Sequence, residues 1–303
     1  MKSIGMTFDD FISDREISCS PKTILKYRDD AKIFFRYLKI IKMDPEFTEL
    51  SALPADAYKG FVVWMRTKRI RAVSIRSYCR SVKVFLRWCC SNGLCPDLTS
   101  GVKLPRDDSK VKLPLYASEV KKIDSCFQLM RPSHQGIRDY CIFHLMLDCG
   151  LRRQEVVNLN IDDLAFDKNV LMIMDSKGNK SRMVLIPDFL LSKIKWYLGK
   201  RINDPGNVFL SLRGSDPISD NTVKMIMQHL KKKSGVDRLH AHLLRHTFAT
   251  SYLIGGGNLE FLRVFLGHSD YDVTKIYSSM AAQMKMLGAD VYKLDPIFFT
   301  RGY

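Results

Sequence analysis

The stretch HAHLLRHTFATSYLIGGGNLEFLRVFLGHSDYDVTKIYSSM, residues 240–280, decides how the second half of this chain folds and carries most of its chemistry. The spacing of its apolar residues predicts a helix over residues 241–254. His242 and Arg245 lie three positions apart in that helix, so their side chains are expected on one face.

A second helix follows directly in this stretch. A glycine triplet begins at Gly255 and ends the first helix, and Asn258 is a favoured N-cap for the next helix, which we expect to close at Gly267. His268 comes immediately afterwards, and Tyr277 lies in the short segment beyond it. A guanidinium, two imidazoles and a phenol in one compact helical piece suit an anionic substrate. The alternative is a buried helix pair whose polar residues cap its turns.

The net charge of the chain indicates a polyanionic partner. Its 303 residues, enough for two domains, carry 48 Lys and Arg against 32 Asp and Glu, a net charge of +16. Nucleic acid is favoured over a membrane because no amphipathic basic helix and no long apolar run stands out. The alternative is a basic protein without a nucleic-acid partner.

The cysteines show no metal-binding spacing, and most fall at apolar helical positions, where a free thiol acts as a small hydrophobe. They are Cys19, Cys79, Cys89, Cys90, Cys95, Cys126, Cys141 and Cys149. The N-terminal sequence MKSIGMTFDDF lacks the apolar core of a signal peptide. We therefore expect a cytoplasmic, nucleoid-associated protein. No carboxylate cluster or phosphate-binding loop predicts a metal or a nucleotide cofactor.

Residues 7–92 have a helical pattern throughout, which predicts a small bundle. Ser20 followed by Pro21 marks one helix start, and further helices are expected over about 54–67 and 74–88. Basic residues line one face of the last helix and the segment before it, a pattern that can neutralise phosphates or enter a major groove. This basic stripe consists of Arg66, Lys68, Arg69, Arg71, Arg76, Arg80, Lys83 and Arg87. A solvated helix face would show the same pattern.

A linker is expected after the bundle. Residues 96–114, PDLTSGVKLPRDDSKVKLP, combine prolines, a glycine and mixed charges without periodicity, and they exceed most connections inside one domain. The sequence therefore predicts a helical domain over residues 1–95 and a second domain over residues 115–303.

The fold class expected for the whole chain is mostly α with a small β-hairpin, an α+β arrangement. Two short runs, 170–174 and 181–186, predict strands separated by the turn-forming sequence DSKGNK. Lys177 is therefore expected near the tip of a hairpin, with Lys180 as an alternative on the same turn. The remaining segments predict helices, including one in the tail that ends near Tyr292.

Five segments, taken in order, resemble the catalytic signature of the tyrosine recombinases, closest to the Xer-type and small transposon or phage integrases. They are GLRRQEVVNL at 150–159, SKGNKSRMVLIP at 176–187, HLLRHTFAT at 242–250, LGHSD at 266–270 and Tyr277. The resemblance covers residues 111–277, and the helical bundle resembles that family's core-binding domain in pattern. It implies a core-binding bundle followed by a tyrosine-recombinase catalytic domain.

The resemblance implies roles for the residues that cleave DNA. Tyr277 would attack a DNA phosphate and form a 3′-phosphotyrosyl bond, with Tyr271 as its nearest rival. Arg152 and Arg245 would hold the non-bridging oxygens of that phosphate. Guanidiniums suit this task because they form bidentate bonds to phosphate oxygens and stabilise the charge of the transition state.

The resemblance also implies roles in proton transfer. Lys177 would protonate the leaving 5′ oxygen, and His242 and His268 would handle protons and bind the phosphate. Glu155 and His246 would hold these groups in position without contacting the DNA themselves. A phenol has a pKa of about 10 and needs help to ionise, whereas histidine exchanges protons near neutrality. Exchange of a phosphodiester for a phosphotyrosine and back requires neither metal nor ATP.

The sequence therefore predicts a site-specific recombinase that exchanges strands between two double-stranded DNA sites, with no small-molecule substrate. The resemblance implies a homotetramer, or a heterotetramer with a paralogue, and we expect the apolar Phe298 and Phe299 to dock on a neighbouring subunit. No arm-binding domain is expected before Thr7. The rivals are a type IB topoisomerase-like enzyme and a catalytically inactive accessory DNA-binding protein.

Overall fold

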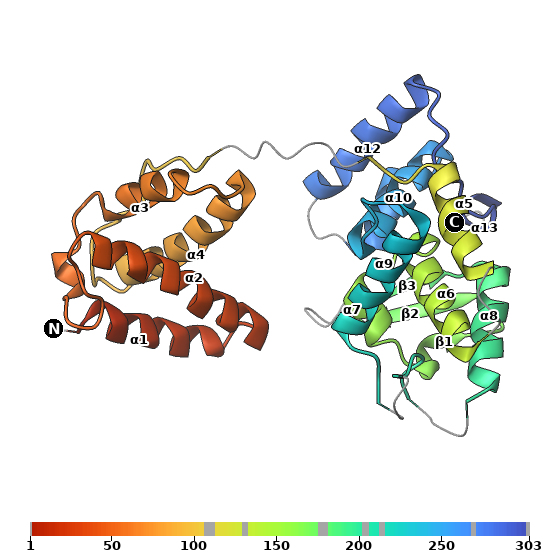
Figure 1. Ribbon diagram of the computed structural model, residues 1–303, viewed down its shortest axis with the longest axis horizontal. Helices are drawn as coiled ribbons and strands as arrows, with labels where there is room; N and C mark the ends of the chain where they lie inside the picture. Colours follow the sequence, from red (N-terminus) through yellow and green to blue (C-terminus); the bar gives the residue numbers. More distant parts are fainter. Residues whose placement is uncertain are drawn as a thin grey trace. The chain divides into compact units, whose positions relative to one another are not determined.

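The computed structural model describes most of the chain and divides it into two compact units. The described ranges are 2–105, 113–128, 133–174, 181–201, 206–211, 216–267 and 271–300, without the side chains of 271–273 and 300. The first unit is Met1–Val111 and the second is Lys112–Tyr303. Over these ranges the chain is mostly helical with a small three-stranded sheet, which confirms the expected fold class (Figure 1).

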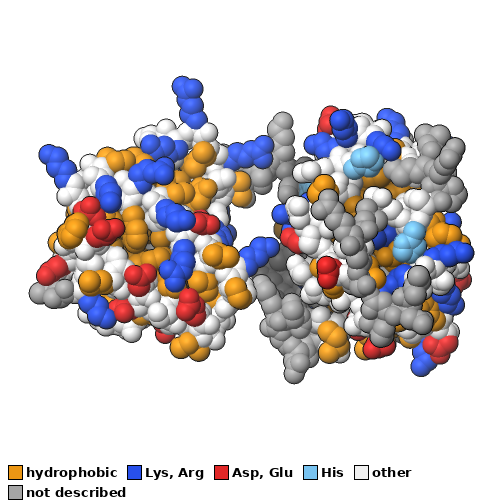
Figure 2. All heavy atoms as spheres, turned by 60° about the horizontal axis from the view of Figure 1, so that its bottom comes forward, with side chains coloured by type: hydrophobic (Ala, Val, Ile, Leu, Met, Phe, Trp, Pro, Cys, Tyr) orange, Lys and Arg blue, Asp and Glu red, His pale blue; other side chains and the backbone are white. Residues whose placement is uncertain are grey.

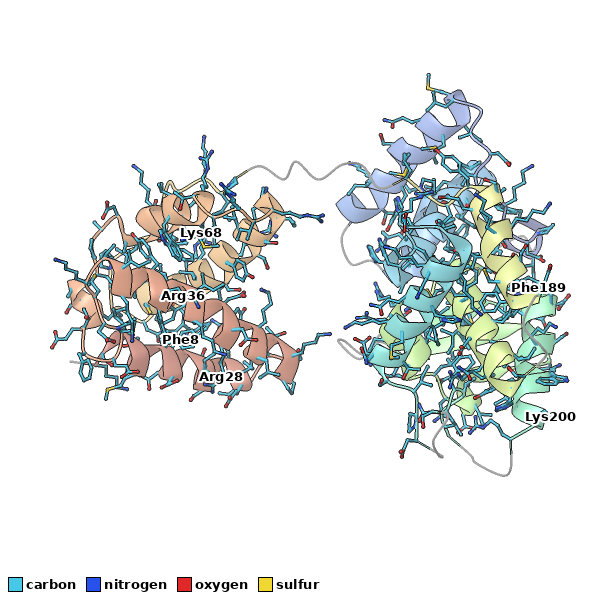
Figure 3. All side chains as sticks on the ribbon, in the orientation of Figure 1. Phe8, Arg28, Arg36, Lys68, Phe189 and Lys200 are labelled. Carbon is cyan, nitrogen blue, oxygen red and sulfur yellow. The ribbon has the colours of Figure 1, made fainter. Side chains whose placement is uncertain are left out.

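The first unit is a helical bundle (Figure 1). Its helices are α1 (Ile4–Glu16), α2 (Pro21–Ile40), the short 3-10 helix η1 (Leu50–Ala52), α3 (Ala57–Arg66) and α4 (Ala72–Ser91). The hydroxyl of Ser20 caps α2, and Pro21 occupies the first helical position. Aromatic rings fill the core. Phe8 belongs to α1 (Figure 3), and its ring centroid is 5.5 Å from that of Phe35 of α2 and 5.3 Å from that of Phe85 of α4.

The first unit continues past the point where a linker was expected. Leu98 is 5% exposed, Thr99 is fully buried, and Leu104 packs against the same core. Oδ1 of Asp97 accepts hydrogen bonds from the backbone N–H and the hydroxyl of Thr99, at 2.8 and 2.7 Å, and so closes a turn around Leu98. The expected linker start at residue 96 is too early, because an aperiodic segment can still place single apolar side chains in a core.

The second unit is built around one buried helix, α10 (Figure 1). Its elements are α5 (Ala117–Gln128), α6 (His134–Leu147), α7 (Arg153–Val157), η2 (Ile161–Asp163), β1 (Leu164–Ala165), β2 (Val170–Met174), β3 (Ser181–Leu185), α8 (Asp188–Gly199), α9 (Asp220–Ser234), α10 (Ala241–Ile254), α11 (Leu259–Leu266), α12 (Tyr271–Met286) and α13 (Ile297–Thr300). α10 packs against α6, α9, α11 and α12, and residues 243–252 are buried on all its faces. A helix that is buried all round is a central core element.

Two residues, one at the start of α10 and one in the turn beside it, fix the position of this helix. His240 caps the helix through Nδ1, which accepts a hydrogen bond from the backbone N–H of Leu243. Gly150 lies against the middle of α10, with φ +64° and with a position for Cβ only 2.5 Å from the ring of Phe248. Glycine alone fits this close approach in a left-handed conformation. The turn that leads to Arg152 can therefore press against α10.

The small sheet is antiparallel, with the strand order β1-β2-β3. In the pairing of β2 with β3, Ile173 lies opposite Arg182. β2 has the expected bounds and β3 begins at the expected residue. β1 was not expected, because a strand of two residues is too short to show a period in the sequence. The turn between β2 and β3, residues 175–180, lies outside the described residues.

The helix that carries Tyr277 is longer than the sequence suggested. α12 runs from Tyr271 to Met286 as one helix, whereas a short segment and a separate helix ending near Tyr292 were expected. No glycine or proline interrupts these residues, and Gly288, with φ +60°, follows the end of the helix. The nucleophile candidate therefore lies in the middle of a regular helix.

The tail packs on its own chain. Phe298 of α13 is 3% exposed, and its ring lies 5.5 Å from Phe248 of α10 and 6.5 Å from Phe265 of α11. Phe299 stacks on Tyr252 of α10 at 5.7 Å. Phe298 is therefore covered within its own chain by α10 and α11, whereas Phe299 is 39% exposed, so docking of the tail on a neighbouring subunit stays a prediction.

Charge is spread over the surfaces of both units. Figure 2 shows Lys and Arg side chains among acidic and hydrophobic ones on each unit, so basic residues on this face are not confined to one patch.

Within the described ranges, no helix combines the length and hydropathy needed to cross a membrane. In the same ranges, no group of His, Cys, Asp and Glu side chains is arranged to hold a metal ion.

Candidate active site

Glu155 is the centre of an arginine cluster in the second unit. It lies in the first turn of α7, with its side chain 11% exposed. Oε1 accepts a hydrogen bond from Nη1 of Arg152 at 2.8 Å, and Oε2 accepts one from the backbone N–H of Arg152 at 2.7 Å. Arg152 is the N-cap residue of α7, so the carboxylate fixes both its backbone and its side chain at the helix start.

Arg182 joins this cluster from β3 and is not among the site residues predicted from the sequence. Its Nη2 donates to Oε2 of Glu155 at 2.7 Å, and its side chain is 6% exposed. Along β3, Arg182 and Val184 are buried while Ser181 and Met183 are exposed. An arginine at a core-facing position of an alternating strand is the signal that could have identified it, because buried charged side chains need a partner.

Arg245 reaches the cluster from α10 and is 2% exposed. Its Nη1 donates to the carbonyl of Gly150 at 2.7 Å and lies 3.9 Å from Oε2 of Glu155. Its Nη2 donates to the carbonyl of Leu266. The structure therefore brings the two arginines of the sequence signature, Arg152 and Arg245, to one carboxylate.

Three arginines from different parts of the chain bind three consecutive carbonyls at the end of α11. Nε of Arg182 donates to Phe265 at 2.6 Å, Nη2 of Arg245 to Leu266, and Nη2 of Arg152 to Gly267 at 3.0 Å. The last carbonyls of a helix lack partners within it and carry the negative end of the helix dipole. The end of α11 therefore provides negative partial charge to the cluster.

Gly267 lies against the guanidiniums of Arg182 and Arg152, and its backbone conformation favours glycine. It has φ +60°, and a Cβ at this position would stand 3.4 Å from Nη1 of Arg182 and 3.5 Å from Nη1 of Arg152. A glycine in the left-handed conformation is the usual way to end a helix without strain. The helix end and the arginine cluster thus share one residue.

Positive charge exceeds negative charge in the described part of this cluster. Burial alone would raise the pKa of Glu155, but its hydrogen bonds with Arg182 and Arg152 and the nearby charges lower it to about 2. Burial, together with the charge of Arg152, lowers the pKa of Arg245 to about 9. A guanidinium whose charge is disfavoured in this way is stabilised by an added anion. The cluster therefore suits an anionic group such as a phosphate.

Tyr277 lies on α12 within the field of two of these arginines. It is 6% exposed, and its ring centroid is 5.1 Å from that of His246 on α10. Burial raises the pKa of its phenol, and the charges of Arg245 and Arg152 offset part of that rise. The phenol is therefore protonated at neutral pH and needs a base before it can act as a nucleophile.

Of the three histidines in the signature, His242 and His246 lie within the described residues. His242 is exposed in the first turn of α10, and His246, one turn further along, is 8% exposed and contacts Tyr277. The remaining candidates lie outside the described residues: Lys177, Lys180, His268 and the side chain of Tyr271. The structure thus relates His246 to Tyr277 directly, while the roles of the remaining candidates rest on the signature.

Most of the basic stripe in the first unit is solvent-exposed. The exposed members are Arg66, Lys68, Arg69, Arg71, Arg80 and Arg87. Lys83 is half-buried, and so is Arg76, whose Nη1 donates to the carbonyl of Pro105 at 3.1 Å. Lys68 follows α3 (Figure 3), with Nζ 4.2 Å from the ring centroid of Trp64. Arg76 therefore helps to hold the segment after the bundle, and the exposed members present positive charge to solvent.

Comparison with known proteins assigns the chain to a family of DNA strand-transferring enzymes. Residues 115–284 match the phage integrase family. The chain is 29% identical to a tyrosine recombinase of Pseudothermotoga lettingae over 288 residues, 94% of this chain and 96% of that protein. It is 31% identical to tyrosine recombinase XerA of Pyrococcus furiosus over 225 residues, 74% of this chain and 75% of that protein. The chain belongs to the phage integrase family and is a tyrosine recombinase, as its sequence signature predicted.

A solved structure shows the same fold. The Tn1549 transposon integrase, in complex with a circular intermediate DNA, matches with a TM-score of 0.73 at 18% identity, over 95% of this chain and all of that chain. At this identity the likeness shows the fold alone.

Proposed function

We propose that this enzyme exchanges strands between two specific double-stranded DNA sites through a covalent bond between Tyr277 and a 3′ phosphate. The phenol oxygen, on losing its proton, attacks the phosphorus, the bond to the 5′ oxygen breaks, and the 5′ strand end leaves as a hydroxyl after it gains a proton. The 5′ hydroxyl of a second strand then attacks the phosphotyrosine. This step restores the phosphodiester and the phenol.

The arginine cluster beside Tyr277 is the observation that carries this proposal. Arg152 and Arg245 adjoin one carboxylate, that of Glu155, and the charges of both arginines act on the phenol. A pentacoordinate phosphate gathers negative charge, which fixed guanidiniums in a buried site stabilise strongly. Arg152 is 38% exposed at its side chain and is therefore the more accessible of the two to a phosphate oxygen.

The proton transfers are assigned from the sequence signature. Lys177 protonates the leaving 5′ oxygen, and His242 and His268 take and return the phenol proton and bind the phosphate. His246 supports the ring of Tyr277, with which it is in contact. The energy of the broken phosphodiester is kept in the phosphotyrosine, so the cycle as proposed draws on neither a metal nor ATP.

The DNA is proposed to lie along the basic stripe of the first unit, whose exposed members neutralise phosphates. The net charge of +16 supports this partner, as do two DNA-bound structures of similar fold, the Tn1549 integrase and XerH bound to a difH substrate. Four subunits, identical or of two paralogues, act on two sites. Because its substrate is DNA, the enzyme works at the nucleoid in the cytoplasm.

Covalent capture on nicked DNA tests the proposal. A library of nicked duplexes with random sequence traps the enzyme, because the short fragment next to the cleaved phosphate diffuses away and rejoining stops. We expect a protein–DNA adduct with the wild type and with Tyr271→Phe, and none with Tyr277→Phe. Tyr271 is the matched control, since it lies in the same helix. An adduct that persists in Tyr277→Phe would show that the nucleophile is a different residue.

A plasmid with two copies of the captured site separates recombination from simple relaxation. Strand exchange between the two copies is the expected result. Relaxation that proceeds equally well on a plasmid with no copy or one copy would indicate a topoisomerase-like enzyme instead.

A further inference from the structure

Arg182 joins two parts of the arginine cluster, yet the strand-transfer mechanism assigns it no role. Its Nη2 donates to Glu155 of α7 at 2.7 Å, and its Nε donates to the carbonyl of Phe265 in α11 at 2.6 Å. We infer that Arg182 is a positioning residue, which holds Arg152 and the end of α11 in the geometry that DNA cleavage requires. This inference rests on the proposed function.

The contact with Glu155 fixes the direction of Arg152. Oε1 of the carboxylate binds Nη1 of Arg152, while Oε2 binds both Nη2 of Arg182 and the backbone N–H of Arg152. Arg182 therefore limits the rotation of the carboxylate that orients Arg152. Without Arg182, one strong bond to Oε2 is lost and the carboxylate can turn. The Arg152 side chain, 38% exposed, then has a less fixed direction.

The contact with Phe265 fixes the last turn of α11. Gly267, in the left-handed conformation, follows two residues later and ends the helix. His268 is the next residue in the chain, and α12 with Tyr277 comes after it. A shift in the last turn of α11 changes where this segment begins. Arg182 can therefore influence His268 and Tyr277 through the backbone as well as Arg152 through Glu155.

Burial separates the role of Arg182 from that of Arg152. Their side chains are 6% and 38% exposed, respectively, although both bind the same carboxylate. A guanidinium enclosed in this way at a core-facing position of β3 acts through its neighbours. Lysine cannot replace it, because the two contacts use N–H groups at separate points of one planar fork, whereas an ammonium is a single point.

Two variants of Arg182 and a matched control elsewhere in the second unit test the inference. The variants are Arg182→Gln and Arg182→Lys, and the control is Arg138→Gln. Arg138 of α6 is also buried, at 3% exposed, and it donates to a carboxylate, Asp139 at 2.8 Å, and to a carbonyl, Leu210 at 2.9 Å. Its loss removes the same kinds of bond outside the arginine cluster.

Three quantities are measured on the full chain. They are the single-turnover rate of adduct formation at saturating DNA, the Kd for DNA, and amide hydrogen exchange over residues 259–267 without DNA. In Arg182→Gln we expect a rate per folded molecule roughly 10²-fold below wild type, since small displacements of catalytic groups cost about that much. We expect an unchanged Kd and faster exchange in the last turn of α11. Arg182→Lys should not restore the rate.

The control distinguishes positioning from general stability. Arg138→Gln should lower Tm but keep both the wild-type rate per folded molecule and the wild-type exchange in α11. Equal rates in Arg182→Gln and Arg138→Gln, or full rescue by Arg182→Lys, would overturn the inference. If the wild type itself forms no adduct, the proposed function fails. Exchange in α11 then still decides whether Arg182 holds this helix, and exchange unchanged in Arg182→Gln would overturn that too.

Discussion

Nη2 of Arg152 donates to the carbonyl of Gly267 at 3.0 Å, although the two residues are 115 positions apart in the chain. This bond fastens α7 to the end of α11. The same helix end accepts hydrogen bonds from Arg182 and Arg245 at the two preceding carbonyls. The site is therefore assembled around a helix terminus, and the stretch 240–280 supplies only part of it.

Gly267→Ala is expected to slow DNA cleavage as well as to lower stability. A side chain at φ +60° costs about 1 kcal/mol, and its Cβ would contact the guanidiniums of Arg182 and Arg152. A backbone shift that relieves this strain moves the carbonyl of residue 267, which accepts the hydrogen bond from Arg152. The control is Gly235→Ala at the end of α9, with φ +69° and open space for Cβ. Both variants should lower Tm similarly, and equal cleavage rates in the two would contradict this account of Gly267.

The low pKa of Glu155 predicts a loss of stability in acid. The carboxyl has a pKa of about 2 in the folded chain, against an ordinary value of 4.5. Its stabilising effect, about 3 kcal/mol from this difference, is complete above the unfolded pKa and is lost as the pH falls towards 2. We expect Glu155→Gln to lower the free energy of unfolding at neutral pH and to flatten its decline below about pH 5. Denaturant titrations of both proteins measure this, and parallel curves would contradict it.

A buried cluster between α6 and the tail predicts that the stability of the fold decreases as the pH rises. Nδ1 of His144 lies 2.6 Å from Oδ2 of Asp148, Nε2 lies 3.2 Å from Oδ1 of Asp124, and the hydroxyl of Tyr292 donates to Asp148 at 2.7 Å. Burial lowers the pKa of His144, but the two carboxylates outweigh it and raise the pKa to about 9. The stabilising effect of the charged imidazole is therefore complete below 6.5 and is lost as the pH rises through 9.

Unfolding titrations between pH 6 and 9 test this cluster. We expect the wild type to lose stability over this range, and His144→Gln to be less stable at pH 6 with a flatter profile. Tyr292→Phe is the control. It removes one hydrogen bond, which contributes about 1 kcal/mol to stability, but it keeps the imidazole and both carboxylates, so the change of stability with pH should stay the same. A wild-type stability that stays constant from pH 6.5 to 9 would refute the charged imidazole.

Inorganic phosphate is expected to stabilise the protein. Burial and the charge of Arg152 lower the pKa of Arg245 to about 9, so an anion in the cluster relieves an unfavourable charge. A ligand that binds only the folded state raises Tm as its concentration increases. At constant ionic strength, the wild type and Arg138→Gln should show this rise, and Arg152→Gln should not. If chloride gives the same shift as phosphate, the cluster does not bind phosphate selectively.

The sequence predicted the ends of those helices that are set by residues close to the helix end. α10 has the expected bounds because the spacing of its apolar residues and the following glycine triplet are visible in the sequence. Asn258 caps α11 and Gly267 ends it in a left-handed conformation, as expected. Each of these signals lies within a few residues of the feature that it predicts.

The features missed from the sequence depend on contacts between distant segments. Arg182 is bound to α7 and α11, and β3 alone does not reveal those partners. Leu98 is buried by helices earlier in the chain, so an aperiodic segment looked like a linker. Phe298 packs on α10 and α11, so contacts within the chain cover one of the two tail phenylalanines that were expected to dock on another subunit.

The position of the covalent bond tests the central claim most directly. Trypsin cleaves after Arg263, Lys275 and Lys285, so Tyr271 and Tyr277 fall in different peptides, 264–275 and 276–285. The adduct trapped on nicked DNA is digested with nuclease and trypsin, and the peptide that retains a nucleotide is sequenced by mass spectrometry. The account predicts the nucleotide on Tyr277 in peptide 276–285. A nucleotide on Tyr271, or on any residue outside 276–285, would contradict it.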